Sequence, residues 1–173
     1  SSIVMTIGGG TQKGNVGIGT TSPQQLLHIN NTSGDFAAEA VLRGSTSTGT
    51  PKSEIAFKRF TSGDGAEMVL RTSNSSGTIQ DVMTLDTAGN VGIGYSSPSD
   101  FTSVSADNLV VGDGTGSNGI TVFSATNAYG NLAFADGTGT SDQYRGLIQY
   151  GHTLNSMQFF TNVTERMVIN SVG

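Results

Sequence analysis

Apolar residues occur along this chain in short clusters, separated by stretches rich in Gly, Ser, Thr and Asn. Short apolar clusters between turn-forming stretches are typical of β-strands. We expect strands over the clusters at 26–29, 55–57, 66–71, 132–134 and 145–150, and over the segments that begin at Met5, Met83 and Met167. The pattern therefore predicts an all-β fold.

Composition supports this prediction. Gly accounts for 25 of 173 residues, roughly double its usual share, and charged residues for 12%, about half of theirs. A chain so poor in strong helix formers does not favour a helical bundle. A flexible Gly- and Ser-rich linker is the other alternative, but the regular apolar clusters argue against it.

One layout recurs three times along the chain. The segment 83–94 reads MTLDTAGNVGIG, 5–19 reads MTIGGGTQKGNVGIG with three extra residues, and 167–173 reads MVINSVG. When the three Met residues are aligned, the motif glycines fall at 14, 89 and 173, so the spacings are 75 and 84 residues. Self-similarity at a long period indicates an array of like units.

The repeat divides the chain into three parts. We expect 1–29 to be the end of one repeat, 30–98 to be one unit and 99–173 to be a second unit. Between the motifs, Ile55-Ala56-Phe57 matches Leu132-Ala133-Phe134, and the cluster at 66–71 matches the one at 145–150. Because the chain begins without Met and ends in the third motif, we expect it to be part of a longer protein.

The GNVGIG motif has a physical interpretation. Strand alternation places Val16 and Ile18 on one face, with Asn15, Gly17 and Gly19 on the other. Glycine weakens a strand unless another backbone comes close, so the motif predicts close backbone approach. The residues concerned are Gly14, Gly17, Gly19, Val16 and Ile18, and in the second copy Gly89, Gly92, Gly94, Val91 and Ile93.

We expect these motif residues to act in assembly rather than catalysis. Val at Gly17 or Gly92 is therefore expected to impair assembly, whereas Val at Gly137, in a loop, is expected to be tolerated. After the motif, Ser22-Pro23 predicts a capped turn with a short helical turn at 23–25.

Strands this short offer a single chain little core. Ordering the backbone costs about 1–2 kcal/mol per residue, and short strands bury little apolar surface in return. Several identical chains that share one apolar core resolve this difficulty and also pair exposed sheet edges.

The motif residues resemble a known family. GNVGIGTTSPQQLLHI, MTLDTAGNVGIGYSSP and the run from Phe134 to Gly173 are similar to the repeats of phage tail fibres and tailspikes. In that family the repeat lies in the shaft, often ahead of a C-terminal intramolecular chaperone. The resemblance implies an elongated, parallel homotrimeric β-fibre of the virion, intertwined or like a triple β-helix, that presents a receptor-binding tip.

The implied partners are two further copies of the chain, other tail or baseplate proteins, and a host surface glycan or protein receptor, with no cofactor. Two alternatives remain open at this point. The first is a cellular surface or secreted adhesive fibre, which needs the same shaft. The second is a segment of a glycan-degrading tailspike.

Charge and cysteine content exclude several other classes. The net charge of −5 provides no basic stripe for nucleic acid and no polybasic membrane anchor, and no apolar run is long enough to cross a bilayer. The absence of Cys excludes disulfides, thiolate zinc sites and thiol nucleophiles.

Candidate catalytic residues are few. Glycosidases need a carboxylate pair, but the acidic residues are mostly single and lie in expected turns, as at Asp64, Asp113, Asp136 and Asp142. His28 and His152 have no nucleophile motif beside them, and a ring of three His or Asn on a trimer axis is the remaining metal-binding alternative. We therefore predict no catalytic, cofactor-binding or metal-binding residue.

Loops and aromatic residues complete the list of candidates. GDGTGSNG at 112–119 and ADGTGTSD at 135–142 lack the spacing of an EF-hand or a P-loop and are expected to be plain loops. Receptor contacts, if this segment makes them, are expected from 43–53 or 135–145. Tyr144, Tyr150, Phe159 and Phe160 are expected to pack inside the second unit.

Overall fold

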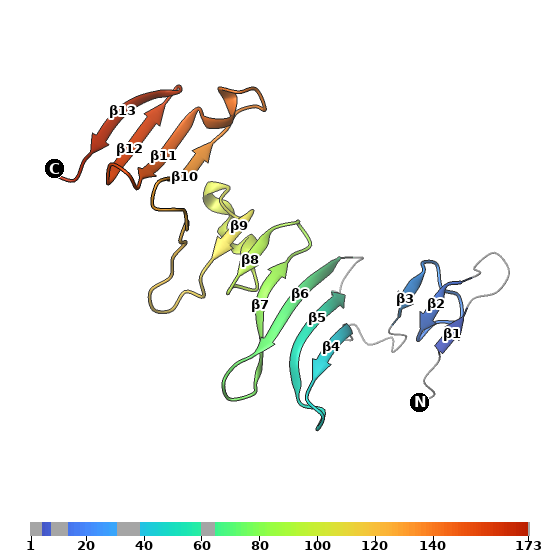
Figure 1. Ribbon diagram of the computed structural model, residues 1–173. Coiled ribbons are helices and arrows are strands. Elements are labelled where there is room, and N and C mark those ends of the chain that lie inside the picture. Colours follow the sequence, from blue (N-terminus) through green and yellow to red (C-terminus); the bar gives the residue numbers. More distant parts are fainter. Residues whose placement is uncertain (1–4, 8–13, 31–38, 60–64, 173) are drawn as a thin grey trace. The chain divides into compact units, whose positions relative to one another are not determined.

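The computed structural model describes residues 5–7, 14–30, 39–59 and 65–172, and in them almost all regular structure is β (Figure 1). This confirms the all-β prediction. The strands are β1 (Met5–Ile7), β2 (Val16–Ile18), β3 (Leu27–Ile29), β4 (Glu39–Ser45), β5 (Pro51–Arg59), β6 (Ala66–Ser73), β7 (Ile79–Leu85), β8 (Val91–Ile93), β9 (Leu109–Val111), β10 (Tyr129–Phe134), β11 (Gly146–Gly151), β12 (Ser156–Thr161) and β13 (Thr164–Ile169). Two 3-10 helices are described, η2 (Pro98–Val104) and η3 (Asp142–Tyr144).

The described strands form three open sheets, with orders β1-β2-β3, β4-β5-β6-β7-β8-β9 and β10-β11-β12-β13. The chain divides into two compact units, Ser1–Gly119 with the first two sheets and Ile120–Gly173 with the third. The repeat boundary expected at residue 98 does not coincide with a boundary between sheets. β9 follows residue 98 and pairs with β8, so both strands belong to the same sheet. The predicted repeat boundaries at 29 and 98 therefore stay predictions about sequence units.

The two copies of the motif pair with their neighbouring strands in the same register. Met5 of β1 lies opposite Ile18 of β2, and Met83 of β7 lies opposite Ile93 of β8. In both copies the motif strand then pairs in parallel with a third strand, β3 or β9. The two three-stranded arrangements β1-β2-β3 and β7-β8-β9 are therefore equivalent residue by residue.

A second equivalence joins the two long antiparallel meanders, β4-β5-β6-β7 and β10-β11-β12-β13. Leu70 lies opposite Met83, and the register shifts after Leu70, so that one residue of β7 is skipped. Phe159 lies opposite Met167, and the register shifts after Phe159 in the same way. This shared β-bulge identifies β13 as the counterpart of β7.

This equivalence corrects both sequence matches. The cluster at 66–71, in β6, corresponds to β12 and not to 145–150, which lies in β11. Counted back from the Met strand, β11 corresponds to β5, so Ile55-Ala56-Phe57 matches Ile148-Gln149-Tyr150 and not 132–134. The sequence comparison missed a strand because β12 lies between 145–150 and the Met strand. Because neighbouring short strands have similar apolar patterns, a match made from sequence can be displaced by one strand.

Candidate assembly face

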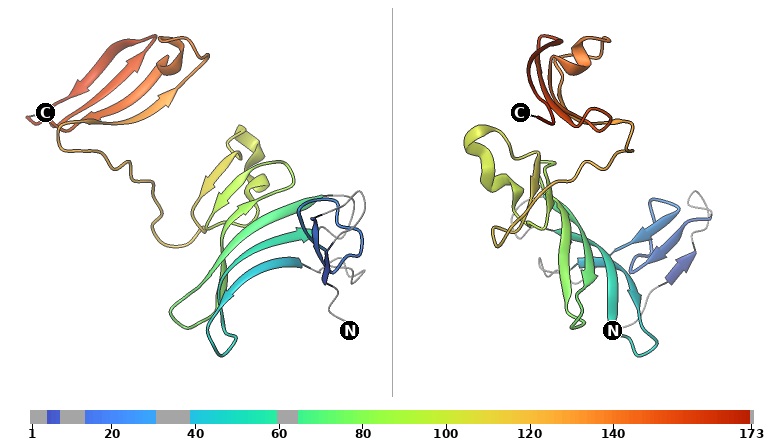
Figure 2. Two further views of the ribbon diagram at one scale, coloured as in Figure 1. Left: turned by 45° about the vertical axis from the view of Figure 1, so that its right-hand side comes forward. Right: turned by 60° about the vertical axis from the view of Figure 1, so that its left-hand side comes forward.

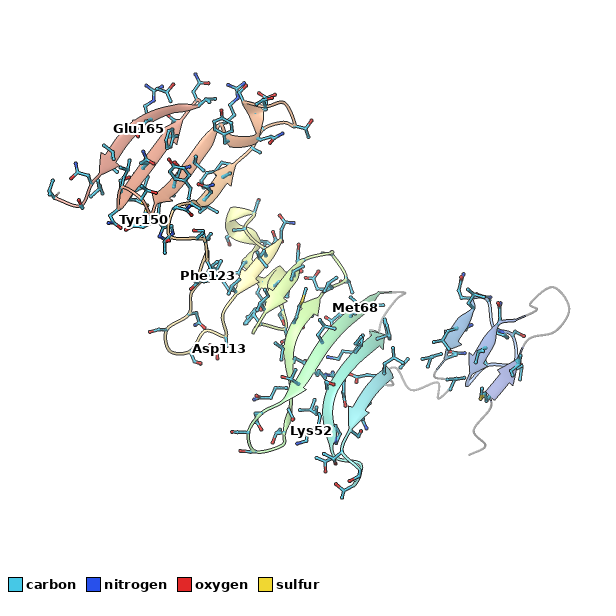
Figure 3. All side chains as sticks on the ribbon, viewed as in Figure 1. Lys52, Met68, Asp113, Phe123, Tyr150 and Glu165 are labelled. Carbon is cyan, nitrogen blue, oxygen red and sulfur yellow. The ribbon has the colours of Figure 1, made fainter. Side chains whose placement is uncertain are left out.

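The six-stranded sheet, whose long strands curve in the views of Figure 2, carries two apolar rows on one side. Residues directly opposite each other in adjacent strands share a face. The first row is Leu42, Ile55, Leu70, Met83, Ile93 and Val111. The second is Ala40, Phe57, Met68, Leu85, Val91 and Leu109. We call these twelve residues the apolar face, and Figure 3 labels Met68 on it.

None of the twelve side chains is buried in the single chain. Phe57 remains 46% exposed and Leu109 55% exposed. The opposite side of the same sheet, in contrast, contains the fully buried Ala56 and Val69. The more strongly apolar side of the sheet is therefore the one left uncovered.

The other two sheets continue the pattern. In β1-β2-β3, the residues Met5, Ile7, Ile18 and Leu27 share one side, and each is at least 40% exposed. In the sheet β10–β13, one row consists of Leu132, Ile148, Phe159 and Met167. Each sheet thus has one side on which apolar residues of adjacent strands lie directly opposite one another.

The turn after each motif strand explains the central glycine. A Cβ on Gly92 would overlap the carbonyl oxygen of Tyr95, and one on Gly17 would lie 2.7 Å from that of Thr20. Close backbone approach is confirmed at these two positions, but the approaching backbone belongs to the same chain, three residues later. The outer glycines also have positive φ values, 85° at Gly89 and 76° at Gly19, which L-residues rarely adopt. At Gly19 a Cβ would in addition overlap the carbonyl oxygen of Asn30.

The proline of each motif closes this turn by packing. Pro23 and Pro98 are fully buried, each with a ring atom 3.4 Å from the Cβ position of its central glycine. In the second copy, Ser97 precedes η2 but makes no side-chain cap hydrogen bond at its start. The predicted helical turn at 23–25 is wrong, because no helix forms at these residues.

A buried polar cluster fixes the second motif. Asn90, 3% exposed, donates its side-chain amide to Ser99 Oγ at 3.1 Å and to Asp107 Oδ2 at 3.4 Å, and its backbone N–H to Asp86 Oδ1 at 2.8 Å. Burial raises the pKa of Asp86, but hydrogen bonds from the Ser99 hydroxyl and from the N–H groups of Asn90 and Ala88 outweigh this effect and lower it. The cluster ties the strand β8 to the connection that leads to β9.

Removal of the Asn90 side chain tests this cluster. Asn90→Ala is expected to lower the free energy of unfolding by about 1–3 kcal/mol, because buried partners lose their hydrogen bonds. The measurement is urea unfolding followed by circular dichroism. Asn131→Ala, at an exposed strand position, is the control and is expected to change it by less than about 0.5 kcal/mol. Equal effects of the two changes would contradict a structural role for the cluster.

The side of the sheet opposite the apolar face carries a charged cluster. Arg71 binds Glu39 (Nη2–Oε1 2.8 Å), Asp81 (Nε–Oδ1 2.5 Å) and, more weakly, Glu54 (Nη1–Oε2 3.4 Å). The side chain of Glu54 is 3% exposed and also pairs with Arg43 at 2.7 Å. Ion pairing thus compensates the buried carboxylate, and the two sides of one sheet have opposite chemical character.

The charged cluster predicts acid sensitivity. The hydrogen bond from Arg71 lowers the pKa of Glu39 despite partial burial. A lowered carboxyl pKa stabilises the fold above the unfolded-state value, about 4.3 for Glu, and this contribution is lost as pH falls through the folded-state pKa. The midpoint temperature of thermal unfolding is therefore expected to decrease as the pH is lowered below about 4.5. The decrease is expected to be less steep in Glu39→Gln. Identical pH dependence in both proteins would contradict this assignment.

The three candidate acidic residues that the structure describes lie outside the strands, Asp113 and Asp136 in connections and Asp142 at the start of η3. Asp113 Oδ1 accepts the backbone N–H two residues later at 2.9 Å, which lowers its pKa. Asp136 and Asp142 both pair with Arg145, at 3.3 Å and 2.9 Å. Asp64 lies outside the described residues. Within the described part of the chain, no group of three or more His, Asp or Glu is placed to hold a metal ion.

The two histidines have local partners. His28 Nδ1 accepts the backbone N–H of Gln24 at 3.3 Å, and His152 Nε2 lies 3.0 Å from Ser124 Oγ. The His152 ring also meets Tyr150 edge-on, with centroids 5.1 Å apart. Both histidines therefore have contacts that suit a structural role.

The four candidate aromatic residues do not form one cluster. Tyr150 and Phe159 lie on the same side of their sheet, Phe160 lies on the other side, and Tyr144 lies in η3. They offer no single stacking platform. No helix in the described segments is long and apolar enough to cross a bilayer.

No protein-family model matches this chain, and no curated protein matches it. The third copy of the motif glycine, Gly173, lies outside the described residues.

Proposed function

We propose that this chain is a shaft segment of a bacteriophage tail fibre, in which three parallel copies bury their apolar faces against one another. The observation that carries the proposal is the apolar face itself, of which no side chain is buried in the single chain. Uncovered contiguous apolar patches larger than a few hundred Å² are rare on soluble monomers and mark interaction sites. Full burial of one such side chain contributes about 1.5–3 kcal/mol.

The shared register supports a second and third copy as the covering partners. All three sheets carry apolar rows at equivalent strand positions, so each sheet needs a covering partner with matching apolar rows. Identical chains aligned in parallel meet this requirement at every sheet at once. A parallel homotrimer also leaves the charged cluster around Arg71 on the side away from the shared core.

In this proposal the segment is structural and belongs to the virion. It performs no catalysis and needs no cofactor, nucleic acid or membrane insertion. Its partners are its own copies and other tail or baseplate proteins, and its rigidity presents a host-binding tip elsewhere in the protein. Because the three copies in one rigid shaft can bind the host surface at the same time, three individually weak contacts give a high avidity. Direct receptor contacts from this segment would come from 43–53 and 135–145.

Light scattering coupled to size-exclusion chromatography tests the proposal. The expected result is a mass three times 17.8 kDa with an elongated hydrodynamic radius. A compact monomer would overturn the shaft assignment, because the single chain would then cover its own apolar face.

A further inference from the structure

The loop that follows β9 is closed by the side chain of Asn118. The segment 112–119 has no regular structure, but Asn118 folds back over its beginning and donates from Nδ2 to the carbonyl oxygen of Thr115 at 3.0 Å. Its Cβ lies 3.0 Å from the position that a Cβ on Gly112 would take, so the glycine leaves room for it. Asp113, labelled in Figure 3, accepts the backbone N–H of Thr115 at 2.9 Å within the same loop. Asn118 therefore holds the loop in its closed form.

The peptide bond after Asn118 is exposed. Asn118 and Gly119 are both exposed and belong to no helix or strand. Within the described segments, the backbone N–H of Gly119 makes no hydrogen bond to a backbone carbonyl. Nothing lies within 4 Å of the position that a Cβ on Gly119 would take. The Gly119 nitrogen is therefore accessible, and it is the backbone nitrogen next to the side-chain carbonyl of Asn118.

We propose that Asn118 is a site of spontaneous deamidation, with water as the one other reactant. The backbone nitrogen of Gly119 loses its proton and bonds to Asn118 Cγ, while the bond from Cγ to Nδ2 breaks and ammonia leaves. The product is a five-membered succinimide ring, which then takes up one water molecule. Opening of the ring at Cγ gives aspartate. Opening at the backbone carbonyl gives isoaspartate, in which the chain continues through the side chain.

Sequence and structure together single out Asn118 among the asparagines. It is the one Asn in the sequence that precedes a Gly, and a residue with a Cβ would hinder approach of its nitrogen and restrict the backbone. Asn74 is also exposed, but it precedes a Ser, and its Oδ1 accepts the backbone N–H groups of Ser76 and Thr78, both at 3.0 Å. Asn90 is only 3% exposed. Asn74 is therefore the internal control.

Deamidation is expected to open the loop. The reaction removes the amide that donates to the Thr115 carbonyl and puts a carboxylate in its place. Hydrogen bonds from Thr115 and from the Asn118 side chain lower the pKa of Asp113, so the new carboxylate would face one that is already ionised. The first compact unit ends at Gly119, so the change falls where the chain leaves that unit. One chain is sufficient for the reaction, which does not depend on the proposed trimer.

Mass spectrometry tests the proposed site. The full-length protein is kept in mildly alkaline buffer, which favours loss of the Gly119 amide proton, and samples are digested and sequenced by fragmentation at intervals. The expected result is a mass increase of about one dalton at Asn118, formed about ten times faster than at Asn74. Conversion at Asn118 that is absent, or no faster than at Asn74, would overturn the inference.

Two substitutions on either side of Asn118 provide a matched pair. Gly119→Ala adds a Cβ where nothing lies within 4 Å, so the fold is expected to be retained while conversion slows about tenfold. Ser117→Ala changes an equally exposed residue on the other side and leaves the reacting nitrogen unaltered, so the rate is expected to stay the same. Equal rates in the two variants would contradict attack by the Gly119 nitrogen.

Hydrogen exchange measures the effect on the loop. The deamidated form carries one more negative charge and is separated from the starting protein by anion exchange. Exchange of the Thr115 N–H, which Asp113 accepts, is expected to be faster in the deamidated form. The Ser76 N–H, which Asn74 accepts in the same way, is the control and is expected not to change. Unchanged exchange at Thr115 would contradict the role of Asn118 in closing the loop.

Discussion

Gly92→Val is expected to prevent formation of the native sheet. A Cβ at this position would overlap the Tyr95 carbonyl oxygen, which belongs to the backbone of a turn that the buried Pro98 holds in place. Backbone cannot move aside as a flexible side chain can, so we expect a loss of about 4 kcal/mol or more in the free energy of unfolding. Circular dichroism and urea unfolding measure the loss.

Three further substitutions rank the effect. Gly17→Val, with 2.7 Å to Thr20, is expected to be less severe than Gly92→Val. Gly119→Val is the matched control, because nothing lies within 4 Å of its Cβ position and its φ is not in the left-handed region. Gly137 is a poorer control than its loop position indicated, because its Cβ would lie 3.1 Å from Asp142. Equal stability of the Gly92 and Gly119 variants would contradict the close-approach argument.

Phe57→Asp is expected to convert the associated form of the protein into a monomer. Phe57 lies on β5, the second strand of the six-stranded sheet, and is 46% exposed in the single chain, so a carboxylate there is tolerated by the monomer. In an assembled core the same carboxylate would be buried without a partner, which costs far more than a lost apolar contact. Light scattering measures the mass of the variant.

Lys52→Asp is the control on the same strand. Lys52 is exposed and lies at the β-bulge where the pairing passes from Ser53 to Pro51, outside both apolar rows. It introduces the same carboxylate and a larger change of charge. We expect its mass to equal that of the unaltered protein. Dissociation of both variants, or of neither, would rule out the apolar face as the contact surface.

Local sequence was sufficient for much of the secondary structure. Five clusters of apolar residues predicted strands near 26–29, 55–57, 66–71, 132–134 and 145–150, and strands occur at each of them. The aligned residues Met5 and Met83 take equivalent positions opposite the motif strands. Alternation also placed Val16 and Ile18 on one side of β2. These features depend on side-chain period and turn chemistry, which are local properties.

Other features were not predicted from the sequence, because they depend on residues that are distant from one another in the chain. The charged cluster was not anticipated, although Glu54, Glu67 and Arg71 alternate with apolar residues in their strands. That alternation indicates a polar side of a sheet, but not which acid meets which base. The match of 55–57 to 132–134 was wrong for a related reason, since only the β-bulge before Met83 and Met167 reveals which strands correspond.

The sequence alone determined that this chain is a β-protein with a repeated Gly-rich motif, because strand period, turn residues and self-similarity can be read without any partner. Only the tertiary structure decided which backbone approaches the central glycines. It also decided which side of each sheet is left uncovered. Both depend on strand register and on the path of the turn after the motif, and neither is specified until strands far apart in the chain are paired.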